Sequence, residues 1–191
     1  MKAALLTFFA IGGFIASSIA SPTAVSDSVA KRQGDDGLAE LGASLETLLS
    51  NIQAQTAIIN STLGSVPDTP TDAEATADAE QIAPQLQAIT DLLTNADSAI
   101  VATKRVLVEA RYGKPDLFKT VSLILYELLF TVKVVLFKLG LGKVVIYLTP
   151  LVLSLKGLLF KLDLVVGGVL LAVGALANEL LKAVGVALIA L

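Results

Sequence analysis

The charged residues of this chain are segregated into two blocks, and this segregation restricts how the chain can fold. Residues 33–103 contain eleven acidic side chains and no basic one, whereas residues 104–191 contain eleven basic and five acidic side chains. The second block is also the more apolar, and it holds all seven aromatic residues that follow position 103. The chain is therefore a block amphiphile, whose two halves are suited to different surroundings.

The overall composition excludes several kinds of chemistry. The 191 residues are 54% hydrophobic and 16% charged, with a mean hydropathy of +0.77 and no cysteine, histidine or tryptophan. Without histidine or cysteine the chain cannot build a Ser-His-Asp or Cys-His nucleophile, or a thiolate or imidazole zinc site. The acidic cluster Asp72, Glu74, Asp78 and Glu80 lacks the glycine turn and ligand spacing of an EF-hand. We expect no enzyme, no cofactor and no metal ion.

The first twenty residues have the layout of a secretory signal peptide. Lys2 supplies a positive charge, an apolar stretch follows, and Ser18-Ile19-Ala20 has the small residues of a cleavage site. We expect residues 1–20 to be removed after Ala20. The alternative is an N-terminal membrane anchor, which the shortness of the apolar run disfavours.

A dibasic pair, Lys31-Arg32, follows the predicted signal peptide. Such a pair is typical of sites cut by subtilisin-type proteases of the secretory pathway, so residues 21–32 are predicted to be a propeptide and Gln33 a new N-terminus. The alternative is a solvated charge pair in an irregular terminus.

Two further features bear on secretion. Asn60-Ser61-Thr62 is the only N-x-S/T sequence, which makes Asn60 a candidate N-glycosylation site. The absence of cysteine means that a secreted form would be stabilised by helix packing or assembly rather than by disulfides.

The acidic part, residues 33–113, is predicted to be an amphipathic helical hairpin. Apolar residues recur at steps of three and four over 38–59 and again over 82–100, with a Pro- and Asp-containing loop between the two runs. Thr71 or Asp72 is suited to cap the second helix. Pro84 either starts that helix or lies within a longer one that begins near Ala73.

The remainder, residues 114–191, is predicted to form about three strongly hydrophobic helices. Asp116 is a candidate N-cap for a helix of about 24 residues, which Gly140-Leu141-Gly142 ends. Eight residues are predicted to form its apolar face: Leu117, Val121, Ile124, Leu125, Leu128, Val132, Val135 and Leu139. The next helix carries a stripe of Lys143, Tyr147, Pro150, Ser154, Gly157 and Lys161, opposite a row of leucines. The many Val and Ile residues leave a β-structure alternative open.

The last apolar segment, Leu164–Leu191, contains Glu179 and Lys182 near its middle. A membrane-spanning helix needs about 20 mostly apolar residues, so these charges disfavour a span without excluding one. Gly167, Gly168, Gly174 and Gly185 are predicted to let neighbouring helices approach closely.

The apolar surface of residues 117–191 exceeds what three or four helices can bury in a monomer. We expect the excess to meet another copy of the chain, a hydrophobic or cell-wall interface, or a lipid or membrane surface. Nucleic acid is not an expected partner, because the lysines are single, well spaced and outnumbered by acids in the whole chain.

The signal peptide, the absence of cysteine, the acidic first half and the hydrophobic, lysine-spaced second half together resemble a fungal family. The chain is similar to the cysteine-free secreted structural proteins of fungal aerial hyphae and cell walls, which accompany hydrophobins. The resemblance covers the whole chain and rests on layout rather than on a catalytic motif. It implies a non-enzymatic protein of the cell wall or extracellular matrix that supports aerial hyphae and attachment to hydrophobic surfaces.

Two other functions stay open from the sequence. One is a membrane-associated protein whose C-terminal helices lie in the bilayer while the acidic helices face outward. The other is an extracellular lipid-binding carrier.

Overall fold

The computed structural model describes residues 26–100 and 114–189, and all of its regular structure is helical. The five helices are α1 (Ser26–Gly64), α2 (Asp72–Ile100), α3 (Lys114–Leu139), α4 (Leu141–Val166) and α5 (Val169–Ile189). No strand is present in these two ranges, so the all-α prediction is confirmed and the β alternative is wrong. The predicted signal peptide and its cleavage site at Ala20 lie outside the described residues.

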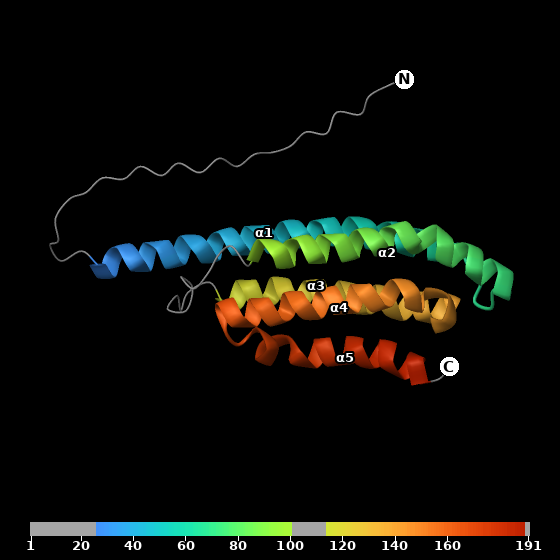
Figure 1. The fold of residues 1–191 in the computed structure, drawn as a ribbon. Helices are drawn as coiled ribbons and strands as arrows, with labels where there is room; N and C mark the ends of the chain where they lie inside the picture. The colour runs from blue at the N-terminus through green and yellow to red at the C-terminus, as the bar shows by residue number, and fades with distance from the viewer. Residues whose placement is uncertain (1–25, 101–113, 190–191) are drawn as a thin grey trace, which may run out of the picture.

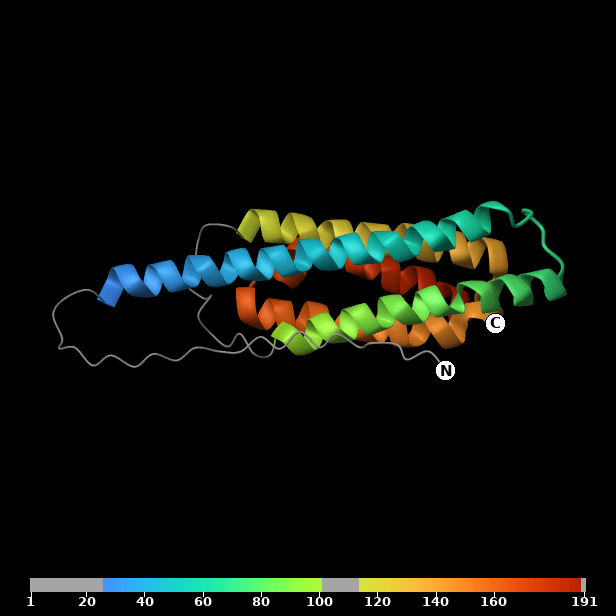
Figure 2. The same cartoon turned by 90° about the horizontal axis from the view of Figure 1, so that it is seen from above.

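The helices stack in three layers (Figure 1). In the first layer α1 and α2 run antiparallel; α3 and α4 form the middle layer, and α5 alone forms the third. Across the layers α1 packs on α3, α2 packs on α4, and α5 packs on both α3 and α4. Seen from above, the N-terminal part of α1 extends past the ends of the other helices (Figure 2).

The turn between α1 and α2 is closed by side chains. The Thr71 backbone N–H donates to Glu74 Oε2 at 2.8 Å, and the Glu74 N–H donates back to Thr71 Oγ1 at 3.3 Å. This reciprocal pair is a capping box, which makes Thr71 the cap of α2. Because α2 begins at Asp72 and continues through Pro84, the longer of the two predicted helices is the one observed.

The start of α3 differs from the sequence prediction. The helix begins at Lys114, so Asp116 lies in its first turn and is not the N-cap. Pro115 explains the difference, because proline has the dihedral angle of a first helical turn and its missing N–H has no helical acceptor there. The carboxylate of Asp116 still lies where the helix dipole favours a negative charge.

Glycines with positive φ separate the last three helices. Gly140, with φ 76°, is the whole connection between α3 and α4, and Gly167 and Gly168, with φ 71° and 84°, connect α4 to α5. The second break was not predicted. It is stabilised by Asp163, whose carbonyl accepts from Gly167 N and whose Oδ1 accepts from Leu170 N at 3.0 Å.

The glycines predicted to permit close helix contact do not do so. A Cβ added at Gly174 or Gly185 would meet no atom within 4 Å, and one added at Gly168 would only touch the end of Phe118. Gly167 and Gly168 instead supply left-handed backbone at a helix end, which other residues adopt at a cost.

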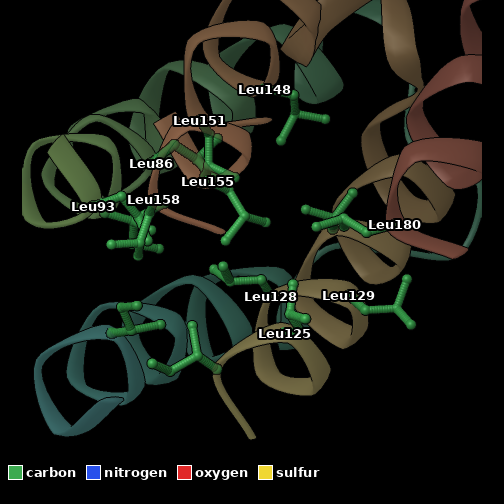
Figure 3. Packing of buried hydrophobic residues seen from close by; sticks show 14 of the residues in the cluster. Leu86, Leu93, Leu125, Leu128, Leu129, Leu148, Leu151, Leu155, Leu158 and Leu180 are labelled. Atoms are coloured by element: carbon green, nitrogen blue, oxygen red, sulfur yellow. The ribbon is translucent and has the colours of Figure 1, made fainter. Parts of the chain in front are cut away.

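One hydrophobic core runs through all five helices. All eight residues of the predicted apolar face of α3 are buried. Leu86 and Leu93 of α2 face Leu151, Leu155 and Leu158 of α4, as Figure 3 shows. The two halves of the sequence therefore share a core and do not form separate modules.

Candidate functional site

The outward face of the α1/α2 layer is acidic. Residues 39–100 contain no lysine or arginine, and seven of their carboxylates are exposed: Glu40, Glu46, Asp68, Asp72, Glu74, Glu80 and Asp91. This layer has a single large exposed hydrophobic residue among its described side chains, Ile58. The first layer is thus suited to water.

The surface of α3, α4 and α5 has the opposite character. Eleven of the twelve large exposed hydrophobic residues among the described side chains belong to these helices. They are Leu123, Tyr126, Phe130, Phe137, Ile146, Leu153, Phe160, Leu164, Leu170, Leu171 and Leu181. Soluble monomers rarely expose this many large apolar groups, so the surface is the strongest candidate for a functional site.

The exposed residues are placed by helical spacing. On α4, Ile146, Leu153 and Phe160 are seven residues apart and form one line along the helix. Leu148, Leu155 and Leu162, on the other side of the same helix, are buried. Since α4 is apolar on both sides, its exposed line is not explained by the packing of this chain.

Three ion pairs join the first layer to the middle layer. Lys138 of α3 lies 2.6 Å from Asp68, Lys143 of α4 lies 2.8 Å from Asp72, and Lys161 of α4 lies 2.6 Å from Asp97. The hydrogen bond and charge of Lys138 hold the pKa of Asp68 below its ordinary value of 3.8. These lysines pair with the acidic half of their own chain.

The lysine stripe of α4 therefore lies along the contact with α2, beside the buried leucines. Ser154 of the stripe lies 3.0 Å from Thr94 of α2, oxygen to oxygen, and a Cβ added at Gly157 would lie 3.8 Å from Asp97. Sequence reasoning located the stripe but did not assign its partner. The small residues between the two lysines were the available signal, because they allow a neighbouring helix to approach.

A second group of lysines is exposed on the apolar layers. Lys119, Lys133 and Lys156 have no ion-pair partner in the described part of the chain, and Lys182 lies 3.6 Å from Glu179 on its own helix. Their long aliphatic stems can cover apolar surface while the ammonium groups stay in water.

A groove of about 620 Å³ runs between α4 and α5. Of the two neighbours of α5, α3 makes the larger contact with it. Leucines, a valine, an alanine and Phe160 form most of its wall, and Lys156 and Asn178 are its polar lining residues.

The predicted processing residues lie on α1. The backbone of Lys31 and Arg32 is in the helical segment that begins at Ser26, while their side chains lie outside the described part of the structure. The first buried side chain described on α1 is Leu41. Cleavage after Arg32 would therefore leave the described core intact, and it stays a prediction.

Asn60 lies in the last part of α1, not in a loop. Its side chain is half-buried and lines a small cavity with Leu63, Phe130 and Lys138. Its Oδ1 has no hydrogen-bond partner among the described residues. The glycan would be attached to the amide nitrogen, whose access the burial of Oδ1 does not determine, so glycosylation of Asn60 stays a prediction.

Two properties of the described residues bear on the remaining function classes. No group of three or more Asp or Glu side chains within 26–100 and 114–189 is placed to hold a metal ion. Residues Pro115–Leu139 and Leu141–Val166 are long and apolar enough to cross a membrane, and 44% and 33% of their most apolar windows are buried inside the bundle. The core helices of a soluble protein meet the same length and composition test.

Comparisons of this chain with known protein families, with curated proteins and with solved structures found no match. The separation of the polar and apolar surfaces is therefore the main structural indication of function.

Proposed function

We propose that this chain is a secreted, non-enzymatic structural protein that acts at surfaces in the fungal cell wall or extracellular matrix. Residues 33–113 form its acidic helical hairpin, and residues 114–191 form its hydrophobic helical region. In this role it supports aerial hyphae and attachment to hydrophobic surfaces. The partners are other copies of the chain and the hydrophobic interface itself.

The observation that carries the proposal is the separation of the two surfaces. The layer of α1 and α2 exposes polar and acidic side chains with one large hydrophobic residue, while α3, α4 and α5 expose aromatic and aliphatic side chains. Covering one half-exposed leucine or phenylalanine contributes about 1 kcal/mol or more, so several together hold the molecule at an apolar surface. The acidic layer then remains in water.

The secretory part of the proposal rests on the sequence. The predicted signal peptide, the dibasic pair and the absence of cysteine, together with the resemblance described above, support secretion by a fungus. The bundle is consistent with a cysteine-free protein, because its core is formed by helix packing alone.

The interfacial role is tested by measuring the surface tension of the purified full-length protein. The double variant F137S/F160S removes two aromatic side chains that are 73% and 58% exposed. We expect slower and smaller lowering of surface tension, with a change in stability of about 0.5 kcal/mol or less per site. The matched control is K119S/K133S, which truncates two exposed residues of α3 without removing an aromatic side chain.

Unchanged surface activity in F137S/F160S would contradict the proposal. Equal losses in both double variants would also contradict it, because the loss would then not be specific to the removal of apolar area.

Membrane association is the second candidate, and the length and hydropathy of α3 and α4 favour it. Insertion of these two helices in a bilayer would require the three-layer bundle to open, since they form its middle layer. Fractionation of a fungal host that expresses the tagged chain distinguishes the two. Protein in medium or wall that begins at Ser21 or Gln33 supports the secreted role, whereas protein confined to carbonate-washed membranes supports membrane association.

A further inference from the structure

The groove between α4 and α5 combines an apolar wall with one cation. Its volume of about 620 Å³ lies within the range of about 300–1,000 Å³ found for small-molecule sites. Leu153 and Phe160 line it from α4, and Leu170 and Leu181 line it from α5. All four are among the exposed hydrophobic residues of the molecule, so a bound apolar chain would cover surface that is otherwise in water.

Lys156 differs from the other lysines of its helix. Lys143 and Lys161 form ion pairs with Asp72 and Asp97 of α2. Lys156 lines the groove, is exposed, and has no ion-pair partner in the described part of the chain. No acidic residue lines the groove, while Asn178 provides an amide on the α5 side. The groove therefore offers hydrogen-bond donors to one negative charge beside an apolar surface.

We propose that this groove binds a long-chain fatty acid, with its carboxylate at Lys156 and Asn178 and its hydrocarbon chain along the leucine and phenylalanine walls. A single acyl chain with one negative charge matches a groove of this size with one lysine. The inference goes beyond the proposed surface activity and does not depend on it, because it concerns one defined groove and a ligand of fixed stoichiometry.

Gly174 gives a direct way to close the groove. It lines the groove, and a Cβ added there would meet no atom within 4 Å. The Cβ of a leucine at this position would therefore be accommodated, and we expect the rest of its side chain to occupy part of the groove. Since leucine is a better helix former than glycine, G174L is expected to leave α5 folded. The matched control is G185L, which makes the same change on α5 at a glycine outside the groove lining.

The test uses the purified, delipidated full-length protein and palmitate, followed by calorimetry and by displacement of a fluorescent fatty acid. We expect saturable binding of one palmitate per chain. Shortening the chain should weaken binding by about fourfold per methylene, the loss expected for each CH₂ not covered. G174L should abolish binding, and G185L should bind as the unmodified protein does.

The role of Lys156 is tested with K156Q and with the uncharged ligand hexadecanol. K156Q should weaken palmitate binding by about 10-fold or more, as expected for loss of a charge-assisted hydrogen bond, and leave hexadecanol binding unchanged. The control K133Q removes an exposed, unpaired lysine of α3 and should change neither affinity.

Several results would overturn the proposal. These are the absence of saturable binding, equal effects of G174L and G185L, equal effects of K156Q and K133Q, or tighter binding of a phosphate-headed single-chain lipid than of palmitate. Surface tension measured on the same variants separates the two proposals: G174L should lose the ligand and keep its surface activity.

Discussion

The α1/α2 layer and the α3/α4 layer bury their inner faces in the same way but present different outer surfaces. In both layers leucine, isoleucine and valine recur at helical spacing and are buried in one core. The exposed side chains of the first layer are mostly small or polar and include seven carboxylates, whereas those of the second include Phe130, Phe137, Ile146 and Phe160. The two layers therefore share the pattern of their buried residues and differ in their exposed residues.

The position of α3 and α4 explains part of their hydropathy. A helix in the middle of three layers is covered on two sides, so it needs apolar residues over a wider arc than a helix of an outer layer. Leu129 lies outside the predicted apolar face of α3 and is nevertheless buried, which is consistent with the packing of α5 on α3. The line Ile146, Leu153 and Phe160 is covered by neither layer, and under the proposed function it is part of the surface that meets an interface.

The largest expected effect tests whether the layers share one core. Leu86 of α2 and Leu148 of α4 are 1% and 0% exposed. Leu86→Ala and Leu148→Ala should each lower the free energy of unfolding by about 2–5 kcal/mol, because each leaves a cavity in the same packed interior. The measurement is urea unfolding followed by circular dichroism, with Leu171→Ala, at a residue 92% exposed, as the control of little effect.

Two separate unfolding transitions, each moved by one of the two core variants, would contradict the shared core. The halves would then be independent modules, and the comparison of layers would become a comparison of domains.

The buried faces of the helices could be predicted from the sequence, because buried apolar residues of a helix recur every three or four positions. The apolar positions of residues 41–59, 82–100 and 117–139 were identified from steps of three and four, and their large aliphatic members are buried. Thr71 and Asp72 were both candidates for the cap of α2, and the structure selects Thr71, which forms a capping box with the acid three residues later. These features depend on residues that are close in sequence, so they can be predicted from the sequence alone.

Features that depend on distant neighbours were not accessible in the same way. The pairing of Lys161 with Asp97 joins residues 64 positions apart, and nothing in the spacing of either helix indicates it. The break at Gly167-Gly168 and the groove beside Gly174 depend on how α5 turns back on α3. Two adjacent glycines in an apolar run were the signal for that turn, which sequence reasoning assigned to close packing instead.

The next expected effect concerns the ion pairs between the layers. Asp97 and Lys161 are 22% and 32% exposed at their side chains, and Lys161 Nζ also donates to the backbone oxygen of Asp97 at 3.2 Å. Asp97→Asn should lower the free energy of unfolding by about 1–3 kcal/mol, because a half-buried ammonium loses its counter-charge. Asp68→Asn should have a smaller and more salt-sensitive effect, since Asp68 is 86% exposed.

A double-mutant cycle with Lys161→Met measures this coupling in urea unfolding. A coupling energy near zero for Asp97 and Lys161 would mean that apolar packing alone holds the first layer on the second.

A smaller effect is expected at the turn of the acidic layer. Thr71→Ala removes the hydroxyl that accepts from Glu74 N–H, so α2 should lose its cap and the protein about 0.5–2 kcal/mol of stability. Thr71→Ser keeps the hydroxyl and serves as the control. Thermal unfolding followed by circular dichroism gives both values, and equal melting temperatures for the alanine and serine variants would show that the capping box does not stabilise the fold.

The smallest expected effect is a dependence of stability on acid pH that originates in the first layer. Hydrogen bonds from Thr71 lower the pKa of Glu74 below its ordinary 4.5, and Lys138 lowers that of Asp68 below 3.8. A carboxyl whose pKa is lower in the folded state stabilises the fold above its unfolded pKa, and this contribution is lost as the pH falls through the folded value.

The melting temperature should therefore begin to fall below about pH 4.5 and continue to fall below pH 3.8. The double variant D68N/E74Q lacks both groups, so its melting temperature should decline less steeply between about pH 5 and about pH 2. Thermal melts of both proteins at a series of pH values and fixed ionic strength measure this difference. If the melting temperatures of the variant and the unmodified protein fall equally with pH, other carboxylates cause the acid sensitivity, and Asp68 and Glu74 do not contribute to it.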